Sequence, residues 1–100
     1  MATQKAVKID GLNVNFPGTI YPLDADKYGV MKRAMLATLP PSNPGMTISD
    51  LKAGILPEIE GPLFPGGDKA GWWIKAVQLD LEARGAIVRE PVSPIRLHRA

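Results

Sequence analysis

Few side chains in this sequence could do covalent or metal chemistry. The chain has no cysteine, and His98 is its only histidine. Disulfides, thiolate metal sites and haem ligation therefore lack their usual ligands. Ser93 precedes His98 across a predicted turn, but a serine nucleophile needs a histidine base that a third group orients, and no such group is evident. We therefore predict no catalytic residue, no metal, no cofactor and no enzymatic activity.

Basic side chains are the second group with a chemical use, because arginine and lysine bind the phosphates of nucleic acids. From Arg84 to the last residue there are four arginines and one acid, Glu90. Such a local basic patch favours contact with duplex DNA. The predicted DNA contacts are Lys69, Lys75, Gln78, Arg89, Arg96 and Arg99.

The net charge and the acidic residues leave an alternative open. A net charge of +2 does not by itself indicate a nucleic-acid partner, since dedicated binders carry a clustered basic excess. Glu58, Glu60 and Glu82 would also repel phosphates. The C-terminal arginines could instead be the solvated charges of an edge hairpin, where they prevent strand-to-strand aggregation.

The adjacent residues Trp72 and Trp73 point to a protein partner instead. Neighbouring residues on a helix project about 100° apart, so the two indoles share one pocket only if the helix is buried nearly all round. We expect at least one indole in the core, and the favoured interpretation is that both are buried under the loop over residues 57–67, because large aromatic side chains dominate small cores. The alternative is that the second indole faces a partner, since tryptophan is enriched at interface hot spots. Leu63, Phe64 and Trp72 are the predicted contacts for a protein partner or a second copy of the chain.

Three helices must position these residues. Apolar residues recur at helical spacing over about residues 25–39, 48–56 and 69–84. Asp24, Thr47 and Asp68 stand where N-caps are expected, Pro57 is predicted to end the second helix, and Gly85 to end the third. The loop over residues 57–67 carries apolar side chains that we expect to pack on the core. Strand-like alternation follows over about 87–90 and 95–99, which predicts a C-terminal β-hairpin.

The remaining sequence is predicted to form an extended N-terminal arm, residues 1–23, with one or two short strands at 7–9 or 19–21. Residues 24–100 then form one domain of mainly α, α+β class, which a chain of 100 residues is long enough to build. No apolar stretch approaches the roughly 20 residues that cross a bilayer, and no signal peptide is recognisable. We therefore expect a cytoplasmic protein with no membrane partner.

The segment from Gln78 to Arg89 reads Gln-Leu-Asp-Leu-Glu-Ala-Arg-Gly-Ala-Ile-Val-Arg and is followed by the predicted hairpin. This arrangement resembles the winged helix-turn-helix superfamily. The resemblance implies that the third helix is a DNA-recognition helix and that the hairpin is the wing. One departure is the connection between the second and third helices, about residues 57–68, which is much longer than the few residues usual in a helix-turn-helix.

A second resemblance covers about residues 15–99. The run Phe-Pro-Gly-Gly, Gly-Trp-Trp and Val-Gln-Leu-Asp-Leu-Glu-Ala, between Phe64 and Ala83, is similar to a small family of uncharacterised bacterial proteins. This resemblance implies a fold, and no catalytic or ligand-binding residue comes with it.

Overall fold

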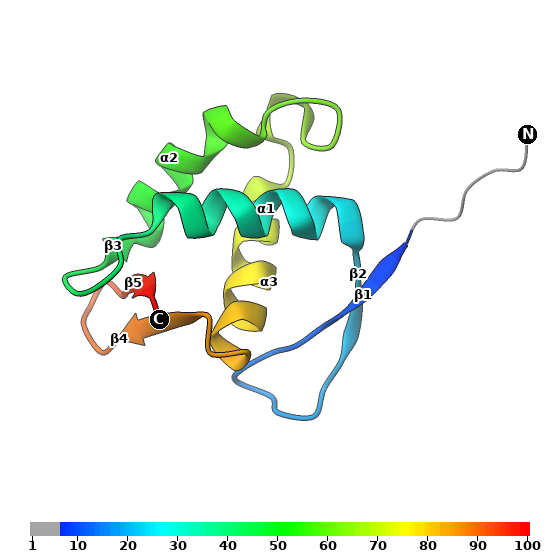
Figure 1. The fold of residues 1–100 in the computed structure, drawn as a ribbon. Helices are drawn as coiled ribbons and strands as arrows, with labels where there is room; N and C mark the ends of the chain where they lie inside the picture. Colours follow the sequence, from blue (N-terminus) through cyan, green and yellow to red (C-terminus); the bar gives the residue numbers. More distant parts are fainter. Residues whose placement is uncertain (1–6) are drawn as a thin grey trace, which may run out of the picture.

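The computed structural model describes residues 7–100, and two of its three helices, α1 and α2, pack against the central helix α3 (Figure 1). The strands β1 (Lys8–Gly11) and β2 (Tyr21–Asp24) come first. They are followed by α1 (Ala25–Thr38), β3 (Met46–Thr47) and α2 (Ile48–Ile59). A short 3-10 turn, η1 (Pro65–Gly67), precedes α3 (Ala70–Ala83), and β4 (Ile87–Glu90) and β5 (Arg96–Arg99) complete the chain. The expected α+β class, with three helices and a C-terminal hairpin, is confirmed.

Local sequence signals explain where most helices begin and end. The Asp24 carboxylate accepts a hydrogen bond from the Lys27 amide at 3.0 Å, and the Thr47 hydroxyl accepts one from the Asp50 amide at 3.2 Å. Each cap satisfies an amide that has no partner within its helix. At the other end of α3, Gly85 has φ 77° and lets the Ala86 amide reach the Leu81 carbonyl. This left-handed glycine and its six-to-one hydrogen bond form a Schellman stop.

Two predicted helix boundaries are wrong. Pro57 lies inside α2, which continues to Ile59. The missing proline amide costs one helical hydrogen bond, but the extra turn buries Ile59 in the core. The third helix begins after Lys69, not Asp68. Lys69 is in the left-handed conformation with φ 60°, and no side chain caps this end of α3.

A short strand that the sequence did not reveal, β3, joins the C-terminal hairpin. The resulting three-stranded antiparallel sheet has the order β3-β5-β4. Met46 pairs with Leu97, and Thr47 pairs with Arg96. Gly45 is needed at this junction because a Cβ there would collide with the Leu97 carbonyl of β5. The sheet therefore ties the α1–α2 connection to the end of the chain.

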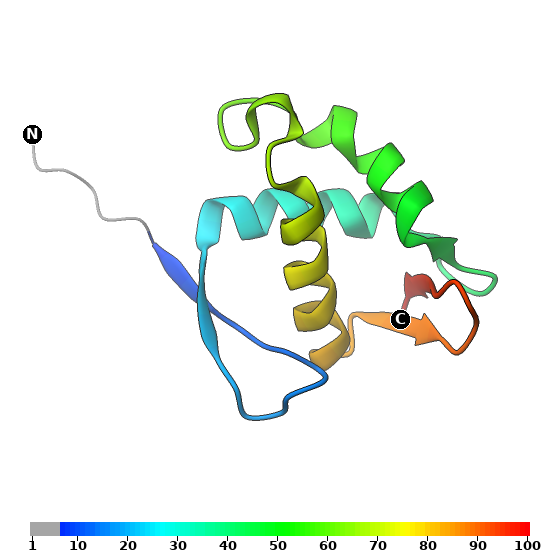
Figure 2. The same cartoon turned by 180° about the vertical axis from the view of Figure 1, so that it is seen from behind.

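The N-terminal arm forms its own two-stranded sheet, in which β1 pairs antiparallel with β2. The two sheets lie on opposite sides of α3 (Figures 1 and 2). Between them, apolar side chains from all three helices fill the core, with Met31, Leu51, Phe64 and Val77 fully buried. The loop after α2 packs on this core as predicted, through Phe64. Within residues 7–100, no helix has the length and apolarity needed to cross a membrane.

Candidate functional site

The C-terminal arginines, which were predicted to bind DNA, are mostly engaged within the fold. Arg89 binds Glu82 with both Nε and Nη2, each at 2.9 Å from a carboxylate oxygen. Arg96 donates from Nη1 to the Gly45 carbonyl at 2.8 Å, which fastens β5 to the connection before β3. Arg84 binds Asp80 at 3.0 Å. Arg99 is exposed. Within the described residues, two of the four arginines are therefore neutralised by acidic neighbours, and a third is held by a backbone carbonyl.

The predicted contacts on α3 divide into two groups. Gln78 is only 2% exposed, and its amide donates to Glu82 at 2.9 Å, so its prediction as a DNA contact is wrong. This side of α3 is covered because β4 packs there and Arg89 from β4 binds Glu82. Lys69 and Lys75, in contrast, are exposed.

His98 has an orienting acid that the sequence did not suggest. Its Nδ1 lies 2.7 Å from a carboxylate oxygen of Glu90, across the β4–β5 pair. Among residues 7–100, Ser93 makes no hydrogen bond to His98, so the pair does not form a nucleophile and base. The same residues contain no group of three or more potential metal ligands.

The two tryptophans take different environments. Trp73 is buried at 7% exposure against Phe64, in an edge-to-face pair with ring centroids 6.1 Å apart. Trp72 is 59% exposed. The favoured prediction that both indoles are buried is therefore wrong, and the structure has the alternative arrangement of one core and one surface indole. Phe64 is fully buried, which removes it from the predicted partner contacts, whereas Leu63 is half-buried.

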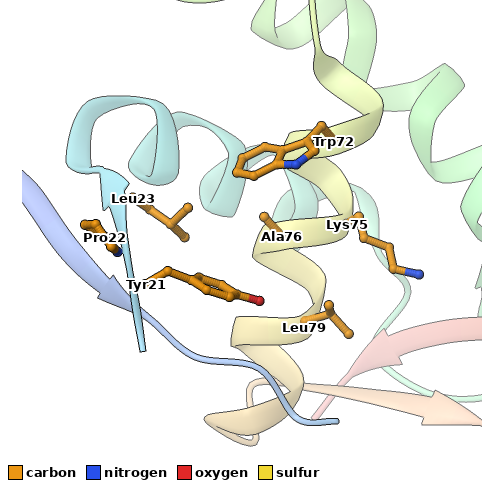
Figure 3. Close-up of a pocket in the computed structure, with 7 residues that line it drawn as sticks. All are labelled: Tyr21, Pro22, Leu23, Trp72, Lys75, Ala76 and Leu79. Carbon is orange, nitrogen blue, oxygen red and sulfur yellow. The ribbon is translucent and has the colours of Figure 1, made fainter. Parts of the chain in front are cut away.

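Trp72 stands between two hollows in the surface. The first, which we call the α3–β2 hollow, has a volume of about 400 Å³ and a mostly apolar lining. Tyr21 projects toward α3 from β2, opposite Trp72 and Leu79, and Lys75 extends from α3 at the rim (Figure 3). The residues that line this hollow are Tyr21, Pro22, Leu23, Trp72, Lys75, Ala76 and Leu79.

The second hollow, the α1–α3 hollow, has a volume of about 500 Å³ and is lined by Lys27, Lys69, Trp72 and Trp73. The Lys27 ammonium lies 6.0 Å from the centre of the Trp73 ring and 5.7 Å from that of Phe64, within range of a cation–π contact. We call the residues of the two hollows together the Trp72 surface. It combines one exposed indole, an apolar recess and three lysines.

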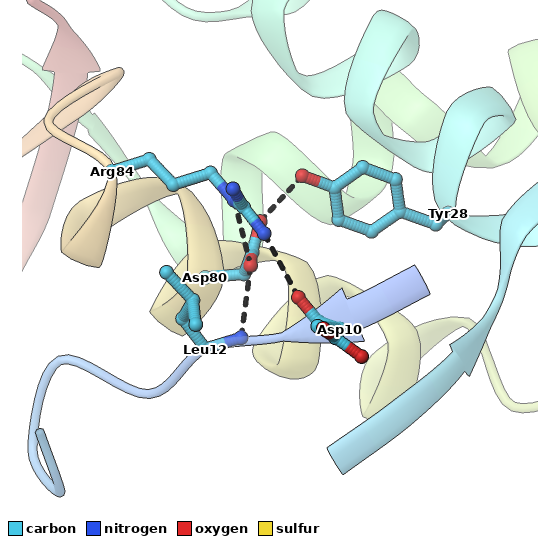
Figure 4. Close-up of polar contacts among 5 residues, drawn as sticks. All are labelled: Asp10, Leu12, Tyr28, Asp80 and Arg84. Carbon is cyan, nitrogen blue, oxygen red and sulfur yellow. Dashed lines mark hydrogen bonds and ion pairs between the residues drawn. The ribbon is translucent and has the colours of Figure 1, made fainter. Parts of the chain in front are cut away.

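A buried carboxylate fixes the arm to α3 next to β1, the strand that pairs with the β2 wall of the Trp72 surface (Figure 4). Asp80 on α3 is fully buried and accepts hydrogen bonds from the Leu12 amide at 2.9 Å, from the Tyr28 hydroxyl and from Arg84. Arg84 also donates to the Asp10 carbonyl at 2.9 Å. The network therefore joins α1, α3 and the arm, so that the arm is fixed against α3.

This network also changes the acidity of its members. Burial, with the hydrogen bond to Asp80 as the next cause, raises the pKa of Tyr28 to about 12. The hydrogen bond to Asp80 raises the pKa of Arg84. Both effects stabilise the state with Tyr28 neutral and Arg84 charged, in which the Asp80 carboxylate has its full set of donors.

Sequence reasoning missed Asp80 and the arm residue Tyr21. Asp80 lies between Leu79 and Leu81, and Ala76, Val77 and Ala83 share its side of the helix; an acid at such a position is the signal that could have identified it. Tyr21 offered no comparable signal, because the contact of β2 with α3 depends on how the arm folds back.

Comparison with known proteins assigns the chain to a family but to no activity. No curated protein matches it, and no solved structure matches it. One family model, described as a family of unknown function (DUF6958), matches residues 8–97. The match begins at β1 and ends within β5, so it includes the arm, all three helices and both sheets. The chain therefore belongs to the DUF6958 family.

Proposed function

We propose that this chain is a non-enzymatic, winged-helix-like domain that binds a protein partner through the Trp72 surface. The observation that carries the proposal is the exposure of Trp72, 59%, on a helix whose other large apolar side chains are buried. Exposing an indole beside an apolar recess is unfavourable in an isolated domain and favourable where a partner covers it. Tryptophan at the centre of such a surface is typical of an interface hot spot.

A peptide selection tests this proposal. Random peptides are selected on the immobilised full chain, and the enriched peptides are measured by fluorescence anisotropy against the native chain and Trp72→Ala. We expect Trp72→Ala to weaken binding by at least about tenfold, which corresponds to roughly 1.4 kcal/mol. Peptides that bind both chains equally, or a selection that yields no peptide dependent on Trp72, would overturn the proposal.

One control variant and one stability measurement separate a lost contact from a lost fold. Val92→Ala removes an apolar side chain, 46% exposed, from the hairpin turn, away from the Trp72 surface, and should leave peptide affinity unchanged. The free energy of unfolding of Trp72→Ala should stay within about 1 kcal/mol of the native value, because little apolar area is lost from the core.

Duplex DNA is a second candidate ligand. The winged-helix resemblance supports it, and so does one feature of the surface: the Lys52 ammonium lies over Gly71, one helical turn before Lys75 on α3. These two lysines could meet phosphates if α3 entered a groove. Binding to a random duplex should then weaken steeply with salt and with the double variant Lys52→Ala, Lys75→Ala. Saturable binding whose affinity changes neither with salt nor in the double variant would exclude duplex DNA as the ligand of these lysines.

A further inference from the structure

The charges around the Trp72 surface have one sign. Three charged side chains line its two hollows, and all three are lysines: Lys27, Lys69 and Lys75. Lys52 adds a fourth ammonium close to Gly71. No acidic residue within the described chain lines either hollow. A partner that covers Trp72 therefore meets a cationic rim.

Within the part of the chain that the structure describes, none of these lysines has an ionic partner. Within residues 7–100 the salt bridges involve Arg84, Arg89 and His98, and none involves a lysine. The Lys27 ammonium makes cation–π contacts with the rings of Phe64 and Trp73 in place of an ion pair. Lys69 and Lys75 have none in this part of the chain, so their charges are available to a ligand.

The α3–β2 hollow indicates which kind of side chain a partner would insert. Its floor is apolar, from Leu23, Ala76 and Leu79, and its volume of about 400 Å³ accommodates one bulky apolar side chain. The Tyr21 ring that forms one wall is held in position, since its hydroxyl accepts a hydrogen bond from Asn13 at 2.8 Å. A wall fixed before binding lowers the entropic cost of seating an anchor.

We infer that the partner presents an acidic segment that carries a bulky apolar anchor; this inference rests on the proposed protein-binding function. The anchor enters the α3–β2 hollow beside Trp72, and flanking carboxylates meet Lys69 and Lys75. Charge complementarity of this kind selects among partners and speeds their encounter. An aliphatic or aromatic anchor fits the hollow, whereas a basic or neutral segment leaves the lysine rim unpaired.

Two other occupants fit less well. A second copy related by a twofold axis would place one lysine rim against the other, because such an interface uses the same patch on both subunits. A single-stranded nucleic acid could stack a base on Trp72 and pair phosphates with the lysines. The apolar floor of the α3–β2 hollow, however, offers few hydrogen-bonding groups to the polar edges of a base.

The peptides that depend on Trp72 provide the test. We expect them to be enriched in aspartate and glutamate on either side of a leucine, isoleucine, phenylalanine or tryptophan. Replacing their acids by the matching amides should weaken binding at least about tenfold at low salt, and the double variant Lys69→Glu, Lys75→Glu of the full chain should do the same. Arg33→Glu, which reverses an exposed cation at a different hollow, should change affinity less than about threefold.

The outcomes separate this inference from the proposed function. Trp72-dependent peptides that are neutral or basic, or whose affinity ignores the two lysines, overturn the acidic partner and leave the protein-binding function standing. An oligothymidylate that binds more tightly than any selected peptide overturns both in favour of single-stranded nucleic acid. Concentration-dependent dimerisation in sedimentation equilibrium that Trp72→Ala abolishes replaces the acidic partner by a second copy.

Discussion

The C-terminal arginines and the lysines of the Trp72 surface are both cationic, but the fold uses them differently. Arg84, Arg89 and Arg96 each bind an acceptor within the molecule, and these bonds fasten the arm, the hairpin and β3. Lys69 and Lys75 bind no acceptor within residues 7–100. Charge that stabilises the fold is largely unavailable to a ligand. The comparison teaches that the region richest in arginine is the poorer candidate for recognition.

The largest expected effect comes from the Asp80 network. Asp80→Ala should lower the free energy of unfolding by about 3 kcal/mol, because it leaves the Arg84 charge, the Tyr28 hydroxyl and an arm amide without their acceptor. Urea denaturation measures this loss. Lys75→Ala, the matched change of a charge on the same helix, should cost less than about 0.5 kcal/mol. Equal losses of unfolding free energy in the two variants would contradict the distinction between charges that stabilise the fold and charges that are free.

Hydrogen exchange sharpens the same prediction. In Asp80→Ala the Leu12 amide loses its acceptor, so its exchange should accelerate more than that of amides in α1. An unchanged Leu12 amide would show that the arm stays fixed against α3 without the carboxylate.

A smaller effect concerns the pH dependence of stability. Because the folded pKa of Tyr28, about 12, lies above the ordinary value of 10.0, the neutral hydroxyl stabilises the fold below pH 10. That stabilisation is lost as the pH rises from 10 through 12. The loss amounts to about 2 kcal/mol in the native chain and is absent in Tyr28→Phe.

Absorbance of the tyrosinate provides the direct measurement. The native chain has two tyrosines, and Tyr28→Phe should remove the late titration, near pH 12. Tyr21→Phe is the matched control and should leave the late titration in place. If the late titration persists in Tyr28→Phe, it does not belong to Tyr28, and the prediction is wrong.

The smallest effect tests whether a neutralised arginine can be released. Glu82→Gln removes the charge that binds Arg89 and should lower the free energy of unfolding by about 1 kcal/mol, since the pair is only partly exposed. If duplex DNA is a ligand, the freed Arg89 should also tighten low-salt binding about threefold. Affinity that falls instead would mean that Arg89 needs Glu82 to reach the DNA.

Several features of the fold followed from short-range patterns. Asp24, Thr47 and Gly85 marked helix ends correctly because caps and left-handed stops depend on residues within a few positions of one another. The two errors were also local. Pro57 lies inside α2 because burial of Ile59 outweighs one lost hydrogen bond. The N-cap position of α3 is Lys69, not Asp68.

By itself, the sequence determined the three helices, the C-terminal hairpin and the absence of cysteine chemistry. It also required the adjacent tryptophans to point in different directions, because the helical period separates neighbours. Only the tertiary structure decided that Trp72 faces outward and that Arg89 is bound to Glu82. It alone brought Leu12 to Asp80, which lies 68 residues away. Such pairings depend on how distant segments pack, and no local pattern encodes which donor meets which acceptor.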